Sequence, residues 1–474
     1  MTGRTVFRQD GVIVPEEVLQ GFAASVRGNV IRPGDEVYEA ARRVWNGMIN
    51  RFPAMILYCR DTTDVIKAVD FARTNKLLAA VRSGGHNVAG NAVCEGGLVI
   101  DLSLMKGIDI DAASRIARAD AGLTWGEFDQ ATHVYGLATT GGLVSSTGIA
   151  GLTLGGGIGW LMRKFGLTCD NLLSVRIVTA DGQHLIVSEK ENADLFWGLR
   201  GGGGNFGIIT SFTYRLHPAA QVLAGMIIYP ADNAATLLRF YRDYISLIPE
   251  GLTTMFLFLT LLPAPELPER LFGMRAIAVY FCYTGDADEG LKAMQPLRET
   301  FSPVAGSVGV MPYPRFQSMF DLNAPPGLLN YWKSVYLDAL SDPCIDTITE
   351  YAAGMTSPLT QVHIQHMQGA VSRVPEEAMA FSHRNAFCSL NIVSKWKDPD
   401  ESDEHVAWTR AFAGALMPFS DGVYVNFLGD EGEERVRAAY TPDKYAQLSA
   451  LKKKYDPENF FRLNQNIRPA RSGR

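Results

Sequence analysis

The stretch Arg82-Ser83-Gly84-Gly85-His86-Asn87-Val88-Ala89-Gly90 lies between two short apolar runs, at 77–81 and 97–102. A strand, a glycine loop and a second strand can bring backbone N–H groups against a phosphate-bearing ligand, because glycine has no Cβ to hold the main chain away. An imidazole at His86 could coordinate, move a proton or form a covalent bond. On these residues alone, a glycine turn followed by a surface histidine is an equally good interpretation.

The composition is that of a globular protein larger than one ordinary domain. The chain has 474 residues, of which 47% are hydrophobic and 20% charged, and this length predicts two domains or one large domain with an insertion. The formal net charge of −6 provides no broad attraction to nucleic acid or to an anionic membrane. Many of the 46 glycines fall between Gly84 and Gly207, which indicates a ligand-binding half.

Three features bear on the compartment. The first residues, Met1–Val6, lack the apolar core of a signal peptide. The uncharged stretch Leu143–Met162 is too rich in glycine and hydroxyl side chains for a membrane-spanning helix. The six cysteines are scattered without a C-x-x-C pair, which favours reduced thiols. We therefore expect a cytoplasmic protein without a membrane partner.

The pattern along the chain predicts two differently built halves. A buried strand at Met55–Cys59 and a helix over 65–72, capped within Asp61–Asp64, lead into the His86 loop. Strands are also predicted at 116–119, 173–178 and 184–187, a helix at 124–131, and a hairpin at Asp181-Gly182. Residues 220–420 lack glycine clusters and alternate apolar strands with helical stretches, which indicates a second α+β unit with an antiparallel sheet.

Two motifs suggest other functions but have the wrong context. Gly202-Gly203-Gly204-Asn205-Phe206-Gly207 satisfies G-x-G-x-x-G, but the β-rich run 208–214 follows it where a Rossmann domain needs a helix. His363 and His366 are three residues apart on an apparent strand. They would face opposite sides, which argues against a shared metal.

The sequence also gives little support for a catalytic nucleophile or base. Cys169 has no histidine near it in the sequence and is interpreted as a small buried hydrophobe. Val144-Ser145-Ser146 is not a nucleophile elbow, so hydroxyls there are better suited to bonding a cofactor phosphate. Tyr424-Val425-Asn426-Phe427 is predicted to be a strand with Tyr424 and Asn426 on one face and Phe427 on the other. A phenol acts as a base only if its pKa of about 10 is lowered, and core packing is the alternative for Tyr424.

Taken together, the motifs resemble the berberine-bridge-enzyme-like branch of FAD-linked oxidases, within the vanillyl-alcohol-oxidase superfamily and its PCMH-type FAD-binding fold. The resemblance covers nearly the whole chain and is nearest to the bacterial 6-hydroxynicotine-oxidase-like branch. Its markers are Arg82–His86, Ser146–Gly148, Leu154–Gly159, Leu161–Leu167 with Asp170-Asn171, Asn205–Ile208 and Phe461–Ile467.

The resemblance implies an α+β fold in three segments. Residues 1–217 would form the FAD-binding domain, 218–422 an inserted substrate-binding domain of antiparallel sheet and helices, and 423–474 a C-terminal segment that completes the FAD domain. His86 would bond covalently to the flavin 8α-methyl group. The other residues that the resemblance assigns to FAD are Arg82, Ser83, Gly84, Gly85, Asn87, Gly90, Gly141, Gly142, Ser145, Ser146, Thr147, Gly148, Gly151, Leu152, Gly156, Gly157, Gly159, Asn171, Gly207, Ile209, Asn426, Asn464 and Asn466.

Three positions depart from the family pattern. Val144 stands where many relatives carry a cysteine that forms a second flavin bond, so a single covalent link is expected. Val88 replaces an aromatic residue that relatives often place after the histidine. Phe427 replaces a tyrosine and cannot remove a proton, which leaves Tyr424 and Asn391 as candidate catalytic residues, although an amide is not an effective base.

The implied activity is that of an FAD-dependent oxidase. It would take a hydride from an alcohol or amine carbon of a small organic molecule, as in secondary metabolism, and pass the electrons to O2. The alternatives are a flavin dehydrogenase with another acceptor, a carbohydrate oxidase, and a flavin-binding protein without turnover. We expect a monomer or weak homodimer with no nucleic-acid partner and no metal.

Overall fold

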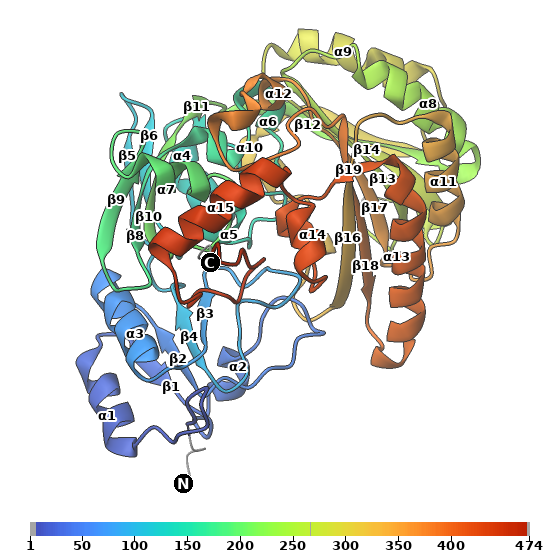
Figure 1. Cartoon of the computed structure of the whole chain (residues 1–474). Coiled ribbons are helices and arrows are strands. Elements are labelled where there is room, and N and C mark those ends of the chain that lie inside the picture. Colours follow the sequence, from blue (N-terminus) through green and yellow to red (C-terminus); the bar gives the residue numbers. More distant parts are fainter. Residues whose placement is uncertain (1–5, 266, 472–474) are drawn as a thin grey trace.

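The computed structural model describes residues 6–265 and 267–471. Figure 1 shows two halves side by side, with the N-terminal residues in blue and green on the left and a large sheet in yellow and orange on the right. Residues 1–5, on which most of the signal-peptide expectation depends, lie outside the described residues. Among the described residues, no helix is both long and apolar enough to cross a membrane.

The His86 loop leaves a small, mostly parallel sheet. The strand order is β1 (Asn29–Ile31), β2 (Met55–Tyr58), β4 (Leu98–Asp101) and β3 (Ala79–Arg82), with β1 antiparallel to β2. Helix α3 (Thr62–Thr74) connects β2 to β3, and the Asp61 side chain caps it by accepting from the N–H groups of Thr63 and Asp64. Its buried face repeats at helical spacing through Val65, Ala68, Val69 and Ala72. The predicted strand–helix–strand unit is confirmed.

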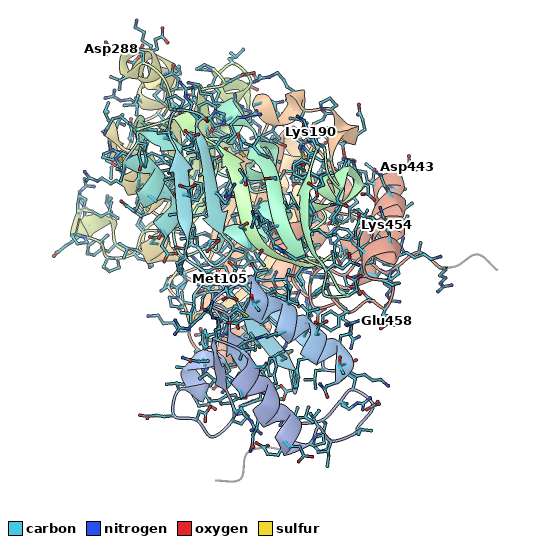
Figure 2. All side chains as sticks on the ribbon, turned by 90° about the vertical axis from the view of Figure 1, so that its left-hand side faces the viewer. Met105, Lys190, Asp288, Asp443, Lys454 and Glu458 are labelled. Atoms are coloured by element: carbon cyan, nitrogen blue, oxygen red, sulfur yellow. The ribbon has the colours of Figure 1, made fainter. Side chains whose placement is uncertain are left out.

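A five-stranded antiparallel sheet packs against this unit, and Figure 2 looks onto it from outside. Its order is β5 (Ile108–Asp111), β6 (Ile116–Asp120), β10 (Ile208–Arg215), β8 (Leu172–Val178) and β9 (His184–Ser188). The β8–β9 hairpin turns at Gly182, whose φ of 82° explains the glycine there. Because β10 rather than a helix follows the 202–207 glycines, the rejection of a Rossmann motif is confirmed.

Short elements fill the space around this sheet. Helix α4 (Trp125–His133) begins at a capping box between Thr124 and Glu127, as the sequence predicts near residue 124. The remaining elements of this half are α1 (Glu16–Ser25), α2 (Tyr38–Ala41), α5 (Ile149–Leu154), α6 (Met162–Phe165), α7 (Ala193–Leu199) and the pair β7 (Leu137–Ala138) and β11 (His217–Pro218). Helix α5, only six residues long, is the main helix within the uncharged stretch 143–162, which is consistent with the prediction that this stretch is not a membrane span.

The second half contains an antiparallel sheet, as predicted, and this sheet has eight strands. Its order is β15 (Ala305–Pro312), β12 (Gln221–Pro230), β14 (Arg275–Tyr283), β13 (Leu252–Thr260), β17 (Gln361–His366), β18 (Cys388–Trp396), β16 (Leu329–Leu337) and β19 (Ser420–Gly422). Its outer face is covered by α8 (Ala234–Ile245), α9 (Ala287–Glu299), α11 (Asp342–Ala353) and α13 (Ser402–Leu416). Short α10 (Tyr313–Gln317) and α12 (Ala370–Arg373) lie toward the first half. The inner face therefore looks toward the glycine loops.

The C-terminal segment returns to the first half through α14 (Glu433–Arg437) and α15 (Pro442–Tyr455). Asn205, in the 202–207 loop, accepts from the Ile467 N–H and donates to the Gln465 carbonyl, so the two segments close on each other.

The strand predicted at Tyr424–Phe427 is wrong. Residues Val425–Phe427 form a single 3-10 turn, closed by a hydrogen bond from the Phe427 N–H to the Tyr424 carbonyl. The Asn426 amide donates to the Leu152 carbonyl and to the Tyr424 hydroxyl, and such side-chain bonds compete with strand pairing. As a result Phe427 does not face away, and all three side chains line one cavity.

Candidate active site

The glycine loop presents His86 to a cavity between the two halves of the chain. The cavity has a volume of about 340 Å3. It is lined by residues of the first half, of the large-sheet half and of the C-terminal segment that starts at residue 423. Gly84 and Gly148 meet so closely that a Cβ on Gly84 would lie 2.2 Å from the Gly148 nitrogen. Gly85 has a φ of 68°, a conformation that favours glycine. The loop therefore needs its glycines both for contact and for conformation.

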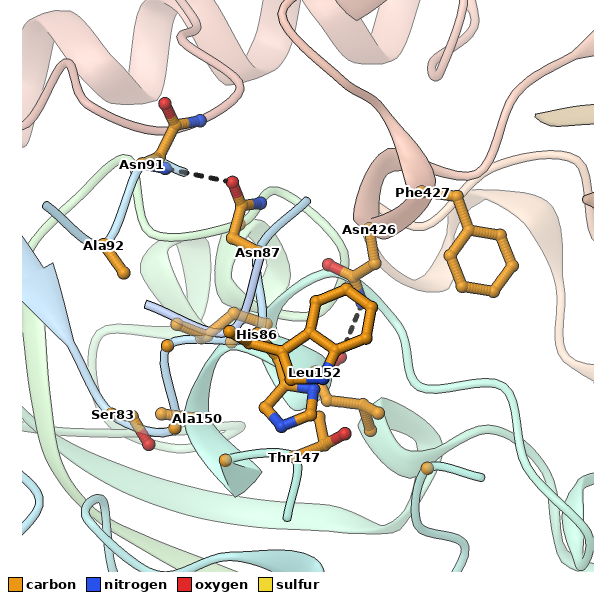
Figure 3. A pocket seen from close by; sticks show the side chains of 18 of the residues that line it. Ser83, His86, Asn87, Asn91, Ala92, Thr147, Ala150, Leu152, Asn426 and Phe427 are labelled. Atoms are coloured by element: carbon orange, nitrogen blue, oxygen red, sulfur yellow. Dashed lines mark hydrogen bonds between the residues drawn. The ribbon is translucent and has the colours of Figure 1, made fainter. Parts of the chain in front are cut away.

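The His86 imidazole is held by two neighbours. Its Nε2 lies 2.9 Å from the Ser146 hydroxyl, and its ring stacks on Trp45 with 5.2 Å between centroids. Figure 3 shows His86 in the cavity near Thr147, Leu152 and Asn426. Burial lowers the pKa of His86 to about 4, so the ring is neutral at physiological pH. A neutral, oriented imidazole is suited to act as a nucleophile.

Many of the residues assigned to FAD line this cavity. They come from the His86 loop, the glycine region 142–152, the start of β10 and the C-terminal segment, and they are Ser83, Gly84, Gly85, His86, Asn87, Gly142, Thr147, Gly148, Gly151, Leu152, Gly207, Ile209, Asn426 and Asn464. The Asn464 Oδ1 is buried without a protein hydrogen bond. Close-packed glycine backbone and an unpartnered buried amide fit a large polar cofactor such as FAD.

The other assigned residues are not among those that line the cavity. Arg82 is ion-paired with Asp101, and Asn171 bonds to the carbonyls of Phe165 and Leu167. The Ser145 hydroxyl, expected to bond a phosphate, instead contacts the Asp321 carboxylate. Four glycines are in close contact with neighbouring residues: Gly90 with Ile49, Gly141 with Gly159, Gly156 with Phe381 and Gly157 with Thr168. Ser146 is hydrogen-bonded to His86, and Asn466 lines an adjoining cavity.

Tyr424 and Asn391 both reach the cavity, but neither is a strong base. The Tyr424 hydroxyl oxygen accepts from the Gly157 N–H at 2.8 Å and from the Asn426 amide at 2.8 Å. Burial outweighs these bonds and raises the pKa of Tyr424 to about 12. The Asn391 Oδ1 is buried with no hydrogen-bond partner, which leaves it free to accept from a ligand.

A polar row on the inner face of the large sheet was not predicted from the sequence. Gln361, His363 and Gln365 on β17 and Lys395 on β18 line the cavity. These polar residues alternate in the sequence with Val362, Ile364 and Ile392, which pack under the outer helices. This alternation is the sequence signal from which a polar inner face could have been predicted. His363 faces the cavity while His366 contacts Arg163, which confirms that the two histidines face apart. No group of three metal-ligating side chains occurs among the described residues.

The six cysteines are free and buried, and Cys169 agrees with its interpretation as a core residue. It lies 3.7 Å from the Met379 sulfur, and burial raises the pKa of its thiol. Val144 lines the cavity, and no cysteine does so among the described residues.

Comparisons with known proteins agree with this architecture. The family models "FAD binding domain" and "Berberine and berberine like" match residues 53–188 and 423–468. An FAD-linked oxidoreductase of Dictyostelium discoideum is 31% identical, covering 96% of this chain and 97% of the relative. The (R)-6-hydroxynicotine oxidase of Paenarthrobacter nicotinovorans is also 31% identical, over 94% of this chain and 97% of its own.

Solved structures show the same fold. The crystal structure of 6-hydroxy-D-nicotine oxidase from Arthrobacter nicotinovorans superimposes with a TM-score of 0.85 at 29% identity, covering 94% of this chain and 98% of that one. A xylooligosaccharide oxidase from Myceliophthora thermophila has a TM-score of 0.83 at 22% identity, which supports the fold alone. With its glycine cradle, its cavity histidine and these relatives, the chain belongs to the berberine-bridge-enzyme-like family of FAD-linked oxidoreductases with a PCMH-type FAD-binding domain.

Proposed function

We propose that this protein is an oxidase whose FAD is bonded to His86 alone, and which oxidises a C–H group beside oxygen or nitrogen in a small organic molecule. The flavin, when bound, accepts the hydride and passes the electrons to O2. The chain's own residues hold the cofactor, orient the donor carbon and keep water out of the cavity.

The geometry of His86 is the observation that carries the proposal. Ser146 engages Nε2 at 2.9 Å and Trp45 fixes the ring plane, so Nδ1 is the nitrogen left for bond formation. Because the pKa of His86 is lowered to about 4, a lone pair is available on the ring across the physiological range. The aliphatic side chain of Val144 in the cavity wall supports a single link, since it has no nucleophilic atom.

The weakness of Tyr424 and His363 as bases bears on the substrate. Burial raises the pKa of Tyr424 to about 12 and lowers that of His363 to about 3. Neither residue matches the proton-transfer work of a base at neutral pH, for which a pKa near the working pH is best. A substrate that ionises readily, or an amine that reacts in its neutral form, makes the smallest demand on such a site.

The decisive experiment is the mass of the denatured protein. We expect one FAD adduct per chain, absent in His86→Ala, while His184→Ala on the exposed end of β9 retains it. An adduct that persists in His86→Ala would refute the tether. Val144→Cys tests the single link, because a thiol there could form a second bond.

Turnover separates the remaining alternatives. Peroxide release with alcohols or amines is expected, and turnover of sugars alone would overturn the proposed substrate class. If a substrate reduces the bound flavin and the reduced flavin is reoxidised only slowly in air, the protein is a dehydrogenase instead. A flavin that no small donor reduces would indicate a protein without turnover.

A further inference from the structure

A buried lysine on the inner face of the large sheet has no acidic partner among the residues that the structure describes. Lys395 is 5% exposed and lines the cavity. Its Nζ donates to the Asn323 carbonyl at 2.8 Å and lies 3.4 Å from Gln361 Oε1. An ammonium group has three N–H donors, so one remains for a ligand. Among the described residues that line the cavity there is no aspartate or glutamate.

An unpaired buried charge is costly, and a bound anion would remove that cost. Burial lowers the pKa of Lys395 to about 8, so the amine is largely protonated at neutral pH. The charge of Lys395 also helps to lower the pKa of His363 to about 3, after burial itself. Lys395 is therefore the positive group of a cavity wall that otherwise carries neutral side chains.

Lys395 and Asn391 mark two ends of this wall. They lie on one face of β18 four residues apart, which corresponds to about 14 Å along the strand. Lys395 is at the His86 end, because the Asn323 that it contacts precedes Ala324, whose carbonyl accepts from Trp45. Asn391 is paired with His363 in the sheet, and both its Oδ1 and the Oε1 of Gln365 are buried without partners.

The wall between these ends is apolar on its β16 side, whereas Gln361 lies beside Val393 on β17. Val393 lies between Asn391 and Lys395, and it is paired across the sheet with Trp332. The Trp332 ring has edge contacts with Trp45 at 5.6 Å and with Phe427 at 5.9 Å. A flat apolar body fits beside such rings better than a polyhydroxylated one.

From this arrangement we infer that Lys395 binds a carboxylate of the substrate, whose aromatic or other apolar body lies along Val393 and Trp332. The oxidisable hydroxyl or amine end then donates to Asn391 or Gln365. This inference rests on the proposed function, because it names the substrate class of the same cavity. It makes Lys395 a residue that determines specificity rather than a base.

The test compares two probes that differ in charge but not in size, 4-(hydroxymethyl)benzoate and 4-(hydroxymethyl)benzamide. Affinities are measured by calorimetry on the flavin-loaded protein. We expect the benzoate to bind tighter than the amide, and Lys395→Met to weaken the benzoate on the order of tenfold to a hundredfold with little effect on the amide. Lys395→Arg, which keeps the charge, should retain part of the preference.

Lys444→Met is the matched control, since Lys444 is also buried but pairs with Glu376 away from the cavity. It should leave both affinities unchanged. The inference is overturned if the benzoate and the amide bind equally to the unmodified protein, if neither binds, or if Lys395→Met weakens both alike. It is also overturned if Lys395→Met alters the flavin spectrum of the ligand-free protein and spares the benzoate, because Lys395 would then serve the cofactor. Flavin content by mass is recorded in parallel, so a failure of the proposed function is seen separately.

Discussion

Replacing Lys452 by methionine should destabilise the protein far more than replacing Lys454, two residues along the same helix. Both lysines make an ion pair of 2.6 Å, Lys452 with Asp456 and Lys454 with Asp194. The first pair is fully buried, with 0% exposure of both side chains, whereas the second is 59% and 45% exposed. Figure 2 shows Lys454 at the surface of the molecule.

The buried pair also joins two cavity segments. The Lys452 Nζ donates to the carbonyls of Asn205 and Phe461, at 2.7 and 2.9 Å. The Asp456 carboxylate accepts from the Phe461 N–H at 2.9 Å. Methionine would leave a buried carboxylate without its counter-ion and the Asn205 carbonyl without this donor, while the Phe461 carbonyl would keep only its bond from the Asn464 amide. Breaking a buried pair in this way costs about 3–5 kcal/mol. An exposed pair contributes about 0–1 kcal/mol.

Thermal unfolding followed by calorimetry measures the difference. The entropy of unfolding of a 474-residue chain is about 1 kcal/mol per kelvin, so Lys452→Met should lower Tm by about 3–5 °C and Lys454→Met by about 1 °C or less. The double variant Lys452→Met/Asp456→Asn should recover part of the loss, because no charge remains buried. Equal shifts for the two single variants would refute the reasoning, since ion-pair length rather than burial would then decide the cost.

Three further predictions concern the cavity and its surroundings. Gly84→Ala places a Cβ 2.2 Å from the Gly148 nitrogen, which should cost about 1–3 kcal/mol and reduce the FAD content measured by absorbance; full FAD content would contradict the close contact. Burial and the neighbouring Arg163 lower the pKa of His366 to about 3, so only the unfolded chain takes up this proton as the pH falls below about 6.5. The free energy of unfolding measured in urea should therefore fall by up to about 2 kcal/mol between pH 7 and pH 5 because of this group. His366→Gln should lessen this fall, and the same pH dependence in the variant would disprove the prediction. Tyr424→Phe should lower turnover less than about tenfold, because a phenol with a pKa of about 12 is a poor base, and complete loss of turnover would show otherwise.

Local patterns were sufficient for much of the first half of the chain. The helix after Asp61, the helix that begins near Thr124 and the hairpin at Gly182 each depend on residues within a few positions of one another. Side-chain caps and positive φ angles act over that range, so sequence reasoning could place them. The same reasoning failed at Tyr424–Phe427, because the turn there is held by a hydrogen bond from the Asn426 side chain to the carbonyl of Leu152, more than 250 residues earlier.

The sequence by itself determined the glycine loop, its histidine and the family, because close backbone approach to a large ligand requires particular residues in a particular local order. Only the tertiary structure decided what surrounds His86 and what faces it. Trp45, Ser146 and Lys395 come from three distant segments, and their roles arise from burial and from the groups that folding places beside them. A lysine in a strand is ordinary in sequence. Only the folded sheet shows that no aspartate or glutamate lies beside Lys395 among the described residues that line the cavity.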